Sequence, residues 1–172
     1  MRRTSIALIG MMGCGKSVTG KAVAKLSGMG FIDTDLAIES SCGRSIPEIF
    51  ASRGEEVFRR LEEEAVAQAA SKTWTVIATG GGVPLRRRNQ GALRRACIIF
   101  YLWASADCLY ERTKDGGRPL LQVEDPKKRL AELLAARDPV YRSLCDKLVP
   151  CDDRTPEQTA RQILSIFRTC PY

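Results

Sequence analysis

Eight residues near the N-terminus have the types and spacing of a phosphate-binding loop. Residues 10–17 have the sequence GMMGCGKS, a full match to the pattern G-x-x-x-x-G-K-[ST]. The segment follows an apolar run and opens a helical pattern, so backbone N–H groups at a helix start would point at phosphates. In this pattern Lys16 reaches the β- and γ-phosphates and the Ser17 hydroxyl ligates Mg²⁺. The sequence therefore predicts a nucleotide site with Mg²⁺.

Two carboxylates, Asp33 and Asp35, flank Thr34 at the end of the next expected strand. Side chains two residues apart on an extended segment point the same way, here into the expected ligand cleft. One carboxylate would support the metal through water, and the other would orient an acceptor hydroxyl. Three glycines, Gly80 to Gly82, follow a further expected strand. They allow close backbone approach and leave N–H donors available, so we expect this turn to face a ligand.

Three arginines far apart in the sequence are candidates for binding an anionic substrate. Arg59 lies in an expected helix, Arg118 in a long polar loop, and Arg137 near the end of another helix. The composition alone favours exposed surface charges at all three positions. Arg59 also has neighbouring glutamates with which it could form ordinary pairs on a helix surface. The three arginines indicate a site for an anionic substrate only in combination with the other motifs.

The composition limits which chemistry the chain can perform. With 172 residues, 44% of them hydrophobic, the chain has the size and composition of one globular domain. It contains no histidine, which excludes Ser-His-Asp and Cys-His catalysis and histidine-containing zinc sites. Seven cysteines with no C-x-x-C pair indicate reduced thiols rather than a disulfide framework. The remaining catalytic groups are carboxylates, lysine, arginine, backbone dipoles and a bound metal.

The charge balance favours an anionic partner. The chain has 27 basic and 20 acidic residues, a net charge of +7, and 19 of the basic residues are arginine. Arginine binds carboxylate and phosphate through two parallel hydrogen bonds, so an anionic small molecule is as plausible as nucleic acid. The basic run at residues 86–88, continued by Arg94 and Arg95, matches no catalytic pattern. We interpret it as a solvated face, with weak polyanion binding as the alternative.

Apolar runs of strand length alternate with helical patterns along the whole chain. We expect strands at residues 6–9, 30–33, 75–78, 97–102 and 147–149, and helices at residues 16–26, 54–70, 85–95 and 156–168. Thr155 is the expected N-cap of the last helix, with Pro156 at its first position. Such alternation predicts an α/β fold with a parallel sheet, helices on both faces and ligands at the carboxyl ends of the strands.

The sequence contains no apolar stretch of about 18 residues, so no membrane-spanning helix is expected. The first residues faintly resemble a lipoprotein signal, but Gly10 interrupts the apolar run and Lys16 follows it. We therefore expect a cytoplasmic protein.

In this order and spacing, the segments GMMGCGKS, DTD, FRRLE, TGGG, RPLL and RDPVY resemble the shikimate kinase family over residues 6–167. The resemblance implies a three-layer α/β/α fold of the P-loop, nucleoside-monophosphate-kinase type with a five-stranded parallel sheet. It implies a single kinase domain over residues 1–172, with an acceptor-binding region at about 33–62 and a lid at about 113–126. The implied reaction transfers the γ-phosphate of ATP to the 3-hydroxyl of shikimate, in the route to the aromatic amino acids.

The resemblance also assigns roles to residues of this chain. The implied catalytic residues are Lys16, Asp35 and Arg118. The implied nucleotide-binding residues are Gly13, Cys14, Gly15, Lys16, Ser17, Val18, Arg118 and Arg154. The implied acceptor-binding residues are Asp35, Arg59, Gly81, Gly82 and Arg137, and the implied Mg²⁺ residues are Ser17 and Asp33. The expected partner is shikimate rather than nucleic acid or a membrane, and the expected state is a monomer.

Other phosphate-binding proteins are the alternatives. A gluconate-type kinase stays open, because gluconate also carries a carboxylate that two arginines would bind; a nucleoside-monophosphate kinase would need a base-reading pocket. A GTPase is excluded, because Asn89, the only asparagine, is followed by Gln90 and cannot form N-K-x-D. A nucleic-acid-binding module would explain the net charge but would leave DTD and the glycine turn without a role.

Overall fold

One parallel sheet of five strands forms the centre of the molecule. The computed structural model describes residues 3–114, 119–121 and 123–170. The strands are β1 (Ser5–Ile9), β2 (Gly30–Asp33), β3 (Thr75–Ala78), β4 (Cys97–Trp103) and β5 (Lys147–Pro150). Their order across the sheet is β2-β3-β1-β4-β5, and every neighbouring pair is parallel. The expected five-stranded parallel sheet is confirmed.

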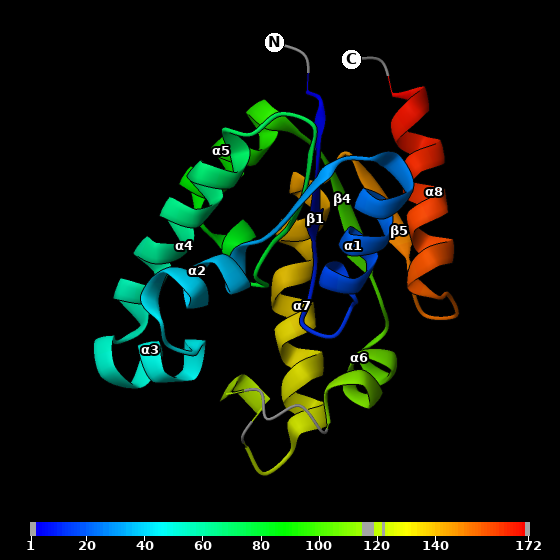
Figure 1. Cartoon of the computed structure of the whole chain (residues 1–172). Coiled ribbons are helices and arrows are strands. Elements are labelled where there is room, and N and C mark those ends of the chain that lie inside the picture. The colour runs from blue at the N-terminus through cyan, green and yellow to red at the C-terminus, as the bar shows by residue number, and fades with distance from the viewer. Residues whose placement is uncertain (1–2, 115–118, 122, 171–172) are drawn as a thin grey trace.

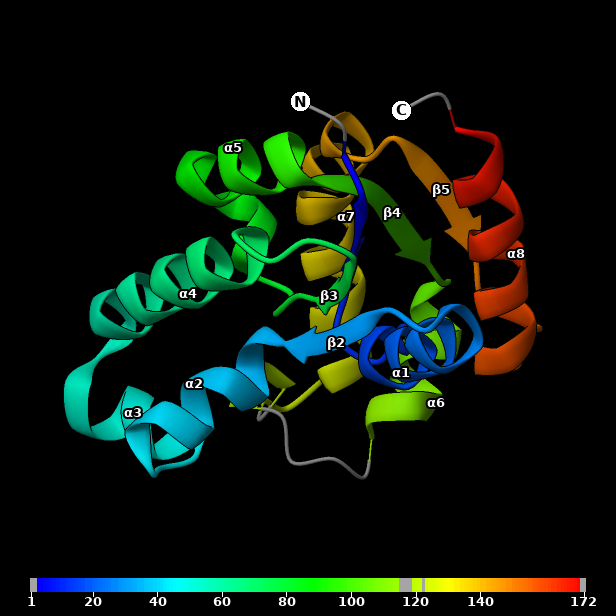
Figure 2. The ribbon, with the colours of Figure 1, turned by 45° about the horizontal axis from the view of Figure 1, so that its top comes forward.

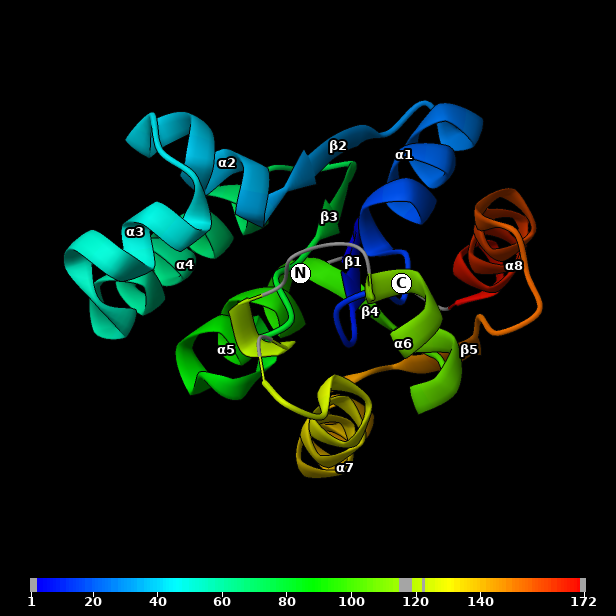
Figure 3. The same cartoon turned by 90° about the horizontal axis from the view of Figure 1, so that it is seen from below.

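Helices cover both faces of this sheet. They are α1 (Lys16–Ser27), α2 (Thr34–Cys42), α3 (Ile46–Arg53), α4 (Glu55–Ala70), α5 (Arg87–Ala96), α6 (Ala106–Thr113), α7 (Pro126–Leu144) and α8 (Pro156–Thr169), with short 3₁₀ turns at Val83–Leu85 and Pro119–Leu121. Helices α1 and α8 lie on one face, and α5 and α7 lie on the other (Figures 1 and 2). Helices α2, α3 and α4 form a lobe beside β2 and β3 (Figure 3). The fold is the expected three-layer α/β/α arrangement.

The core explains why the strands form where the sequence expects them. All five residues of β1 are buried, and six of the seven residues of β4 are buried. Strands covered on both faces are apolar without alternation, as these two are. A second, smaller cluster of Ile38, Ile49 and Phe58 holds the α2–α4 lobe together. The lobe therefore has its own apolar contacts, separate from the main core.

The loops at the carboxyl ends of the strands bring the sequence motifs to one edge of the sheet. Residues 10–15 connect β1 to α1, Asp33 ends β2, and Gly80 to Gly82 follow β3. Gly10 has φ +143°, and a Cβ there would lie 2.5 Å from the Leu102 carbonyl oxygen at the end of β4. Only glycine permits this conformation and this close approach. The phosphate-binding loop is thereby fixed against the central strands.

The structure contains helices that the periodicity did not indicate, at α2, α3 and α6. A usable signal existed for α3, since Glu48 accepts a hydrogen bond from the Ser45 backbone N–H at 2.8 Å, as in a capping box. The helix that carries Arg137 also continues to Leu144 through Pro139. Arg137 therefore lies inside α7 rather than near its end. Buried Tyr141 and Leu144 anchor the turns beyond the proline to the core.

The cysteines and the start of α8 agree with the sequence-based expectations. All seven cysteines are free thiols, as the sequence predicts. Thr155 caps α8 by accepting a hydrogen bond from the Gln158 N–H at 3.2 Å, and Pro156 is the first helical residue. Within the described residues, no helix combines the length and apolar character needed to cross a membrane.

Candidate active site

The phosphate-binding loop is built from backbone. Gly13 and Gly15 have positive φ, a conformation typical of loops whose backbone N–H groups bind an anion. The first turn of α1, which is described in full, carries no acidic residue, so the positive end of its dipole remains available to an anion. The Lys16 ammonium donates hydrogen bonds to the carbonyl oxygens of Gly10 at 2.9 Å and Met11 at 2.8 Å. Lys16 is therefore held inside the loop, where it is buried.

Asp33 links this loop to the next element. One carboxylate oxygen of Asp33 accepts from the Ser17 hydroxyl at 2.5 Å. The other caps α2 by accepting from the backbone N–H groups of Asp35 at 3.0 Å and Leu36 at 3.3 Å. The chain thus turns into a helix at Thr34, because aspartate is a strong N-cap. The expectation that Asp33 and Asp35 share one extended segment was wrong.

The donor set at Ser17 and Asp33 fits Mg²⁺. A hydroxyl and a carboxylate are hard oxygen ligands, and Mg²⁺ in kinases is held by one or two such groups with phosphates and water. The described residues contain no cluster of three or more acidic, cysteine or histidine side chains suited to a metal. An all-protein metal site is therefore absent from the described part of the chain, and Mg²⁺ here would depend on the nucleotide.

A cavity of about 250 Å³ opens beside the loop. Its lining comes from the loop, α1, α6 and the start of α8, and consists of Gly13, Cys14, Gly15, Val18, Thr19, Arg112, Cys151, Arg154, Pro156 and Thr159. The structure thus places Val18 and Arg154, which are far apart in the sequence, in one cavity with the loop glycines. Arg112 was not expected there, and no sequence pattern singled it out. It donates to the carbonyl oxygens of Cys151 at 2.9 Å and Asp152 at 3.2 Å.

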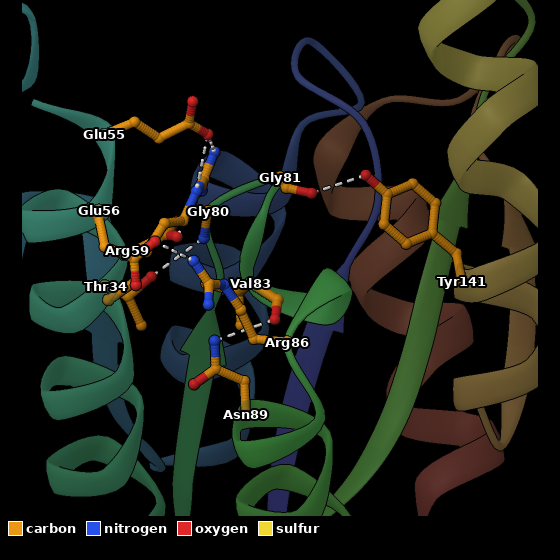
Figure 4. A network of polar contacts seen from close by, with 11 residues as sticks. Thr34, Glu55, Glu56, Arg59, Gly80, Gly81, Val83, Arg86, Asn89 and Tyr141 are labelled. Atoms are coloured by element: carbon orange, nitrogen blue, oxygen red, sulfur yellow. Dashed lines mark hydrogen bonds and ion pairs between the residues drawn. The ribbon is translucent and has the colours of Figure 1, made fainter. Parts of the chain in front are cut away.

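The glycine turn after β3 is where the remaining site residues meet. A Cβ on Gly80 would lie 2.5 Å from Asp35 Oδ1 and 2.9 Å from Glu62 Oε1. The Gly80 N–H donates to the buried Thr34 hydroxyl at 3.0 Å, so it is not available to a ligand as the sequence suggested (Figure 4). This end of the turn therefore lies against two carboxylates.

The other end of the turn lies against two guanidinium groups. A Cβ on Gly82 would lie 2.2 Å from Arg59 Nη1, and one on Gly81 would lie 3.7 Å from Arg137 Nη1. Gly81 also faces the phosphate-binding loop, since the same Cβ would lie 3.7 Å from the Met12 backbone nitrogen. The three glycines make room for charged side chains from α2, α4 and α7. Because of this, the turn has an acidic end and a basic end.

Arg59 is held in a network rather than on a solvated surface. Its guanidinium donates to Glu55 at 3.0 Å (Figure 4) and to Glu62 at 2.5 Å. The Arg59 side chain is only 14% exposed. Burial lowers the pKa of Arg59, but these two carboxylates outweigh it and the pKa lies above its ordinary value. An ordinary surface pair is therefore the wrong description of Arg59.

Glu62 and Tyr141 are site residues that the sequence analysis did not single out. Burial raises the pKa of the Glu62 carboxyl above its ordinary value, while Arg59 opposes that shift. The Tyr141 hydroxyl donates to the Gly81 carbonyl oxygen at 2.7 Å (Figure 4), and burial raises its pKa to about 12. Spacing was an available signal, because Glu62 lies one helical turn after Arg59, and Tyr141 one turn after Arg137.

Arg118, the expected arginine of the lid, lies outside the described residues, as does part of the segment 113–126. Lys16, Ser17 and Asp33 form one group in the structure. Asp35, Arg59, Gly81, Gly82 and Arg137 form a second group, and Gly81 is where the second group faces the first.

Comparison with known proteins gives a consistent result. A family model described as shikimate kinase matches residues 12–168. A shikimate kinase of Thermodesulfovibrio yellowstonii is 45% identical, covering 95% of this chain and 94% of the relative. A second, from Methylococcus capsulatus, is 42% identical over 96% of this chain and 93% of the relative.

Solved structures give the same result for the fold. A shikimate kinase from Acinetobacter baumannii in complex with shikimate has a TM-score of 0.93 and 36% identity, covering 96% of this chain and 93% of that one. A gluconokinase from Sinorhizobium meliloti has a TM-score of 0.58 at 18% identity, over 98% of this chain and 100% of that one. The second likeness concerns the fold alone.

Proposed function

The chain belongs to the shikimate kinase family, and on that premise we propose that it transfers the γ-phosphoryl group of ATP to the 3-hydroxyl of shikimate. The product, shikimate 3-phosphate, is an intermediate in the route to chorismate and the aromatic amino acids. The enzyme is thus an ATP-dependent phosphotransferase with an alcohol acceptor.

The observation that carries the proposal is the polarity of the glycine turn. Shikimate has a carboxylate on one side of a rigid ring and hydroxyl groups on the other. Arg59 and Arg137 lie at Gly82 and Gly81, whereas Asp35 lies at Gly80. A ring bound along the turn would place its carboxylate between two guanidinium groups and a hydroxyl at Asp35. An acceptor of this charge pattern matches the site at both ends.

The reaction itself needs positioning and charge neutralisation more than covalent chemistry. Asp35 orients the attacking hydroxyl and accepts its proton late in the transfer. The loop amides hold the phosphates of ATP. Lys16 exchanges its carbonyl partners, Gly10 and Met11, for phosphate oxygens and stabilises the charge of the transferred group. A carboxylate, an ammonium group and backbone dipoles can perform these steps without histidine.

Ser17 and Asp33 are the residues that we propose for Mg²⁺. When bound, the ion neutralises phosphate charge in this class of enzyme. In this chain, Asp33 orients the Ser17 hydroxyl and ties it to the N-terminus of α2. Asp35 is the second residue of that helix. Asp33 therefore connects the positions of the metal site and of the acceptor hydroxyl.

The nucleotide base is proposed to occupy the cavity between the loop and α8. Support comes from the cavity lining, which joins Gly13, Gly15 and Val18 to Arg154. Arg118 is proposed from the sequence alone as a ligand of the phosphates on a lid over residues 113–126. A single kinase domain, a monomeric state and a cytoplasmic location are also proposed, the last on the seven free thiols, which suit a reducing compartment.

A coupled assay of ADP release tests the proposal. We expect turnover with shikimate that exceeds turnover with gluconate and with nucleoside monophosphates by at least about 100-fold. A nucleoside monophosphate lacks the carboxylate that the two arginines would pair with. Gluconate has a carboxylate, but its flexible chain does not hold a hydroxyl group at a fixed distance from it, as the rigid ring of shikimate does. Equal turnover with gluconate would show that the two arginines do not select the ring, and no turnover with shikimate would refute the assignment of the acceptor.

A further inference from the structure

A groove of about 600 Å³ lies between α4 and α5, away from the active site. Helices α4 and α5 lie side by side on the sheet face opposite α1 and α8 (Figures 1 and 2). The lining consists of Arg60, Glu63, Glu64, Ala67, Arg87, Arg88, Asn89, Gly91, Ala92 and Arg95. The proposed function assigns no role to any of these residues.

Helical spacing explains how the groove forms. On α4 the lining residues recur three or four positions apart from residue 60 to residue 67, and on α5 they do so from residue 88 to residue 95. Each set is therefore one face of its helix. The residues between the charged ones are small, namely Ala67, Gly91 and Ala92. These small side chains leave unfilled space between the two helices, and the longer charged side chains border it.

The basic residues of the groove are only partly neutralised. Arg86, just outside the groove, pairs with Glu56 at 2.7 Å, and Arg88 approaches Glu63 at 3.6 Å. Within the described ranges, by contrast, no side-chain hydrogen bond or ion pair joins Arg60, Arg87 or Arg95 to another residue. The basic run is therefore not a uniformly solvated face. Arg86 ties the start of α5 to α4, Arg88 only approaches Glu63, and Arg87 and Arg95 place unneutralised charge around the hollow.

Phosphate groups are the ligand chemistry that fits this arrangement. A guanidinium forms two parallel hydrogen bonds with phosphate, and its weak hydration favours such pairing in a groove. Arg88 and Arg95 start about 10 Å apart along α5, from the rise of 1.5 Å per residue. Arg60 approaches from the opposite wall. An anion with several phosphate groups can contact cations on both walls, which a single carboxylate cannot do.

We propose that the α4–α5 groove is a second ligand site of this protein, which binds a small anion bearing two or more phosphate groups through Arg60, Arg87, Arg88 and Arg95. The site is separate from the nucleotide cavity, whose lining shares no residue with it. A ligand bound there would also tie α4, which carries Arg59 and Glu62, to α5, which follows the glycine turn.

Calorimetry with inorganic tripolyphosphate tests the proposal. The protein is first saturated with ADP and shikimate, so that the active site is filled, in buffer without Mg²⁺ because the probe chelates it. We expect one saturable site, with affinity falling from tripolyphosphate to pyrophosphate to orthophosphate and falling with added salt. Arg60→Ala and Arg95→Ala, one on each wall, should each weaken binding about tenfold or more.

Two further variants distinguish a specific site from general charge attraction and from a folding defect. Arg168→Ala removes the same charge from an exposed position on α8 and should change the affinity less than about twofold. Glu64→Gln removes an exposed carboxylate from the groove and should tighten binding about two- to fivefold, which a folding defect could not do. Each variant is checked for wild-type shikimate turnover.

Three results would overturn the proposal. One is no saturable binding of tripolyphosphate by the wild type. Another is an equal loss of affinity in Arg168→Ala, which would indicate general attraction to net charge. The third is tight binding of a short oligonucleotide that tripolyphosphate does not displace, which would make the groove a surface for nucleic acid. Because the readout is binding with the active site filled, none of these bears on the proposed reaction.

Discussion

The two halves of the active site position their ligands by different means. On the nucleotide side, backbone defines the geometry: Gly10, Gly13 and Gly15 have positive φ, and the Lys16 ammonium lies on two loop carbonyls. On the acceptor side, side chains from α2, α4 and α7 approach a glycine turn, and ion pairs within α4 hold the Arg59 guanidinium. The first half is fixed by the central strands, and the second by contacts among charged groups.

This difference explains what each half can tolerate. A change of backbone conformation at the loop would displace the amides that we propose bind phosphate, and it would strain a loop packed against the central strands. A change in the acceptor half displaces one charged group while the fold remains. We therefore expect substitutions in the two halves to separate into effects on nucleotide or stability and effects on shikimate.

The largest effect should come from Lys16→Ala. Removing one preorganised charge on the transferred phosphoryl group lowers kcat about 100- to 1,000-fold. The loop backbone forms without the ammonium, so a cooperative thermal transition should remain. Steady-state kinetics and a thermal melt measure both quantities. A kcat near that of the wild type in a folded variant would remove Lys16 from the reaction.

Arg59→Lys and Arg137→Lys should come next. An ammonium cannot reproduce the planar guanidinium, and loss of one arm of a desolvated carboxylate clamp costs about 2–5 kcal/mol when it is complete. We expect kcat/KM for shikimate to fall about 30-fold or more in each variant, while the Kd for ATP changes less than about threefold. A parallel loss of ATP binding would place these arginines on the nucleotide.

A pair of glycine substitutions sharpens the comparison. Gly10→Ala forces a Cβ to within 2.5 Å of a backbone oxygen at φ +143°, and it should destabilise the fold by about 1–3 kcal/mol. Gly82→Ala displaces only the Arg59 guanidinium, at 2.2 Å. We expect it to raise KM for shikimate about tenfold with a smaller loss of stability, because misplaced charges weaken binding without straining backbone.

Denaturation and kinetics on the same two variants measure this contrast. Gly28→Ala is a control for the effect of positive φ alone, since φ is +70° there and no atom lies within 4 Å of the added Cβ. If Gly82→Ala unfolded the protein while Gly10→Ala left it folded, the proposed difference between the nucleotide half and the acceptor half would be wrong.

The smallest effect concerns pH. Burial raises the pKa of Glu62, so its carboxyl is protonated at higher pH than an ordinary glutamate and then ceases to pair with Arg59. The acid limb of kcat/KM for shikimate should reflect this loss, and Glu62→Gln should flatten that limb while lowering the plateau about two- to fivefold.

The contribution of Glu62 to the free energy of unfolding should change with pH in the opposite direction to its contribution to kcat/KM. The native carboxyl binds its proton more tightly than the unfolded chain does, so its contribution is present at low pH and is lost as pH rises through the native pKa. Urea denaturation across this range should show a weaker dependence in Glu62→Gln than in the wild type. An unchanged dependence would mean that Glu62 does not titrate there.

Much of the fold follows from local sequence. The apolar runs that predict strands are buried strands, and the loop of residues 10–17 lies between β1 and α1 as its pattern requires. Helices α2 and α3 were missed because they are short and their stability comes from the small cluster of Ile38, Ile49 and Phe58. Arg137 was expected near a helix end, yet α7 continues through Pro139 to Leu144, where buried Tyr141 anchors the turns beyond the proline.

The residue types and their spacing were sufficient to name the family, and they predicted the nucleotide loop and the charged residues that meet at the glycine turn. Such information is local, because a motif is a set of neighbours along the chain. Tertiary structure alone decided which charges meet. It buried the Glu62 carboxylate that pairs with Arg59 on the same helix, set an acidic and a basic end along Gly80 to Gly82, and left Arg60 facing Arg95 across a groove. The last two arrangements join residues on separate elements, and the energy of every charge depends on the burial that packing creates.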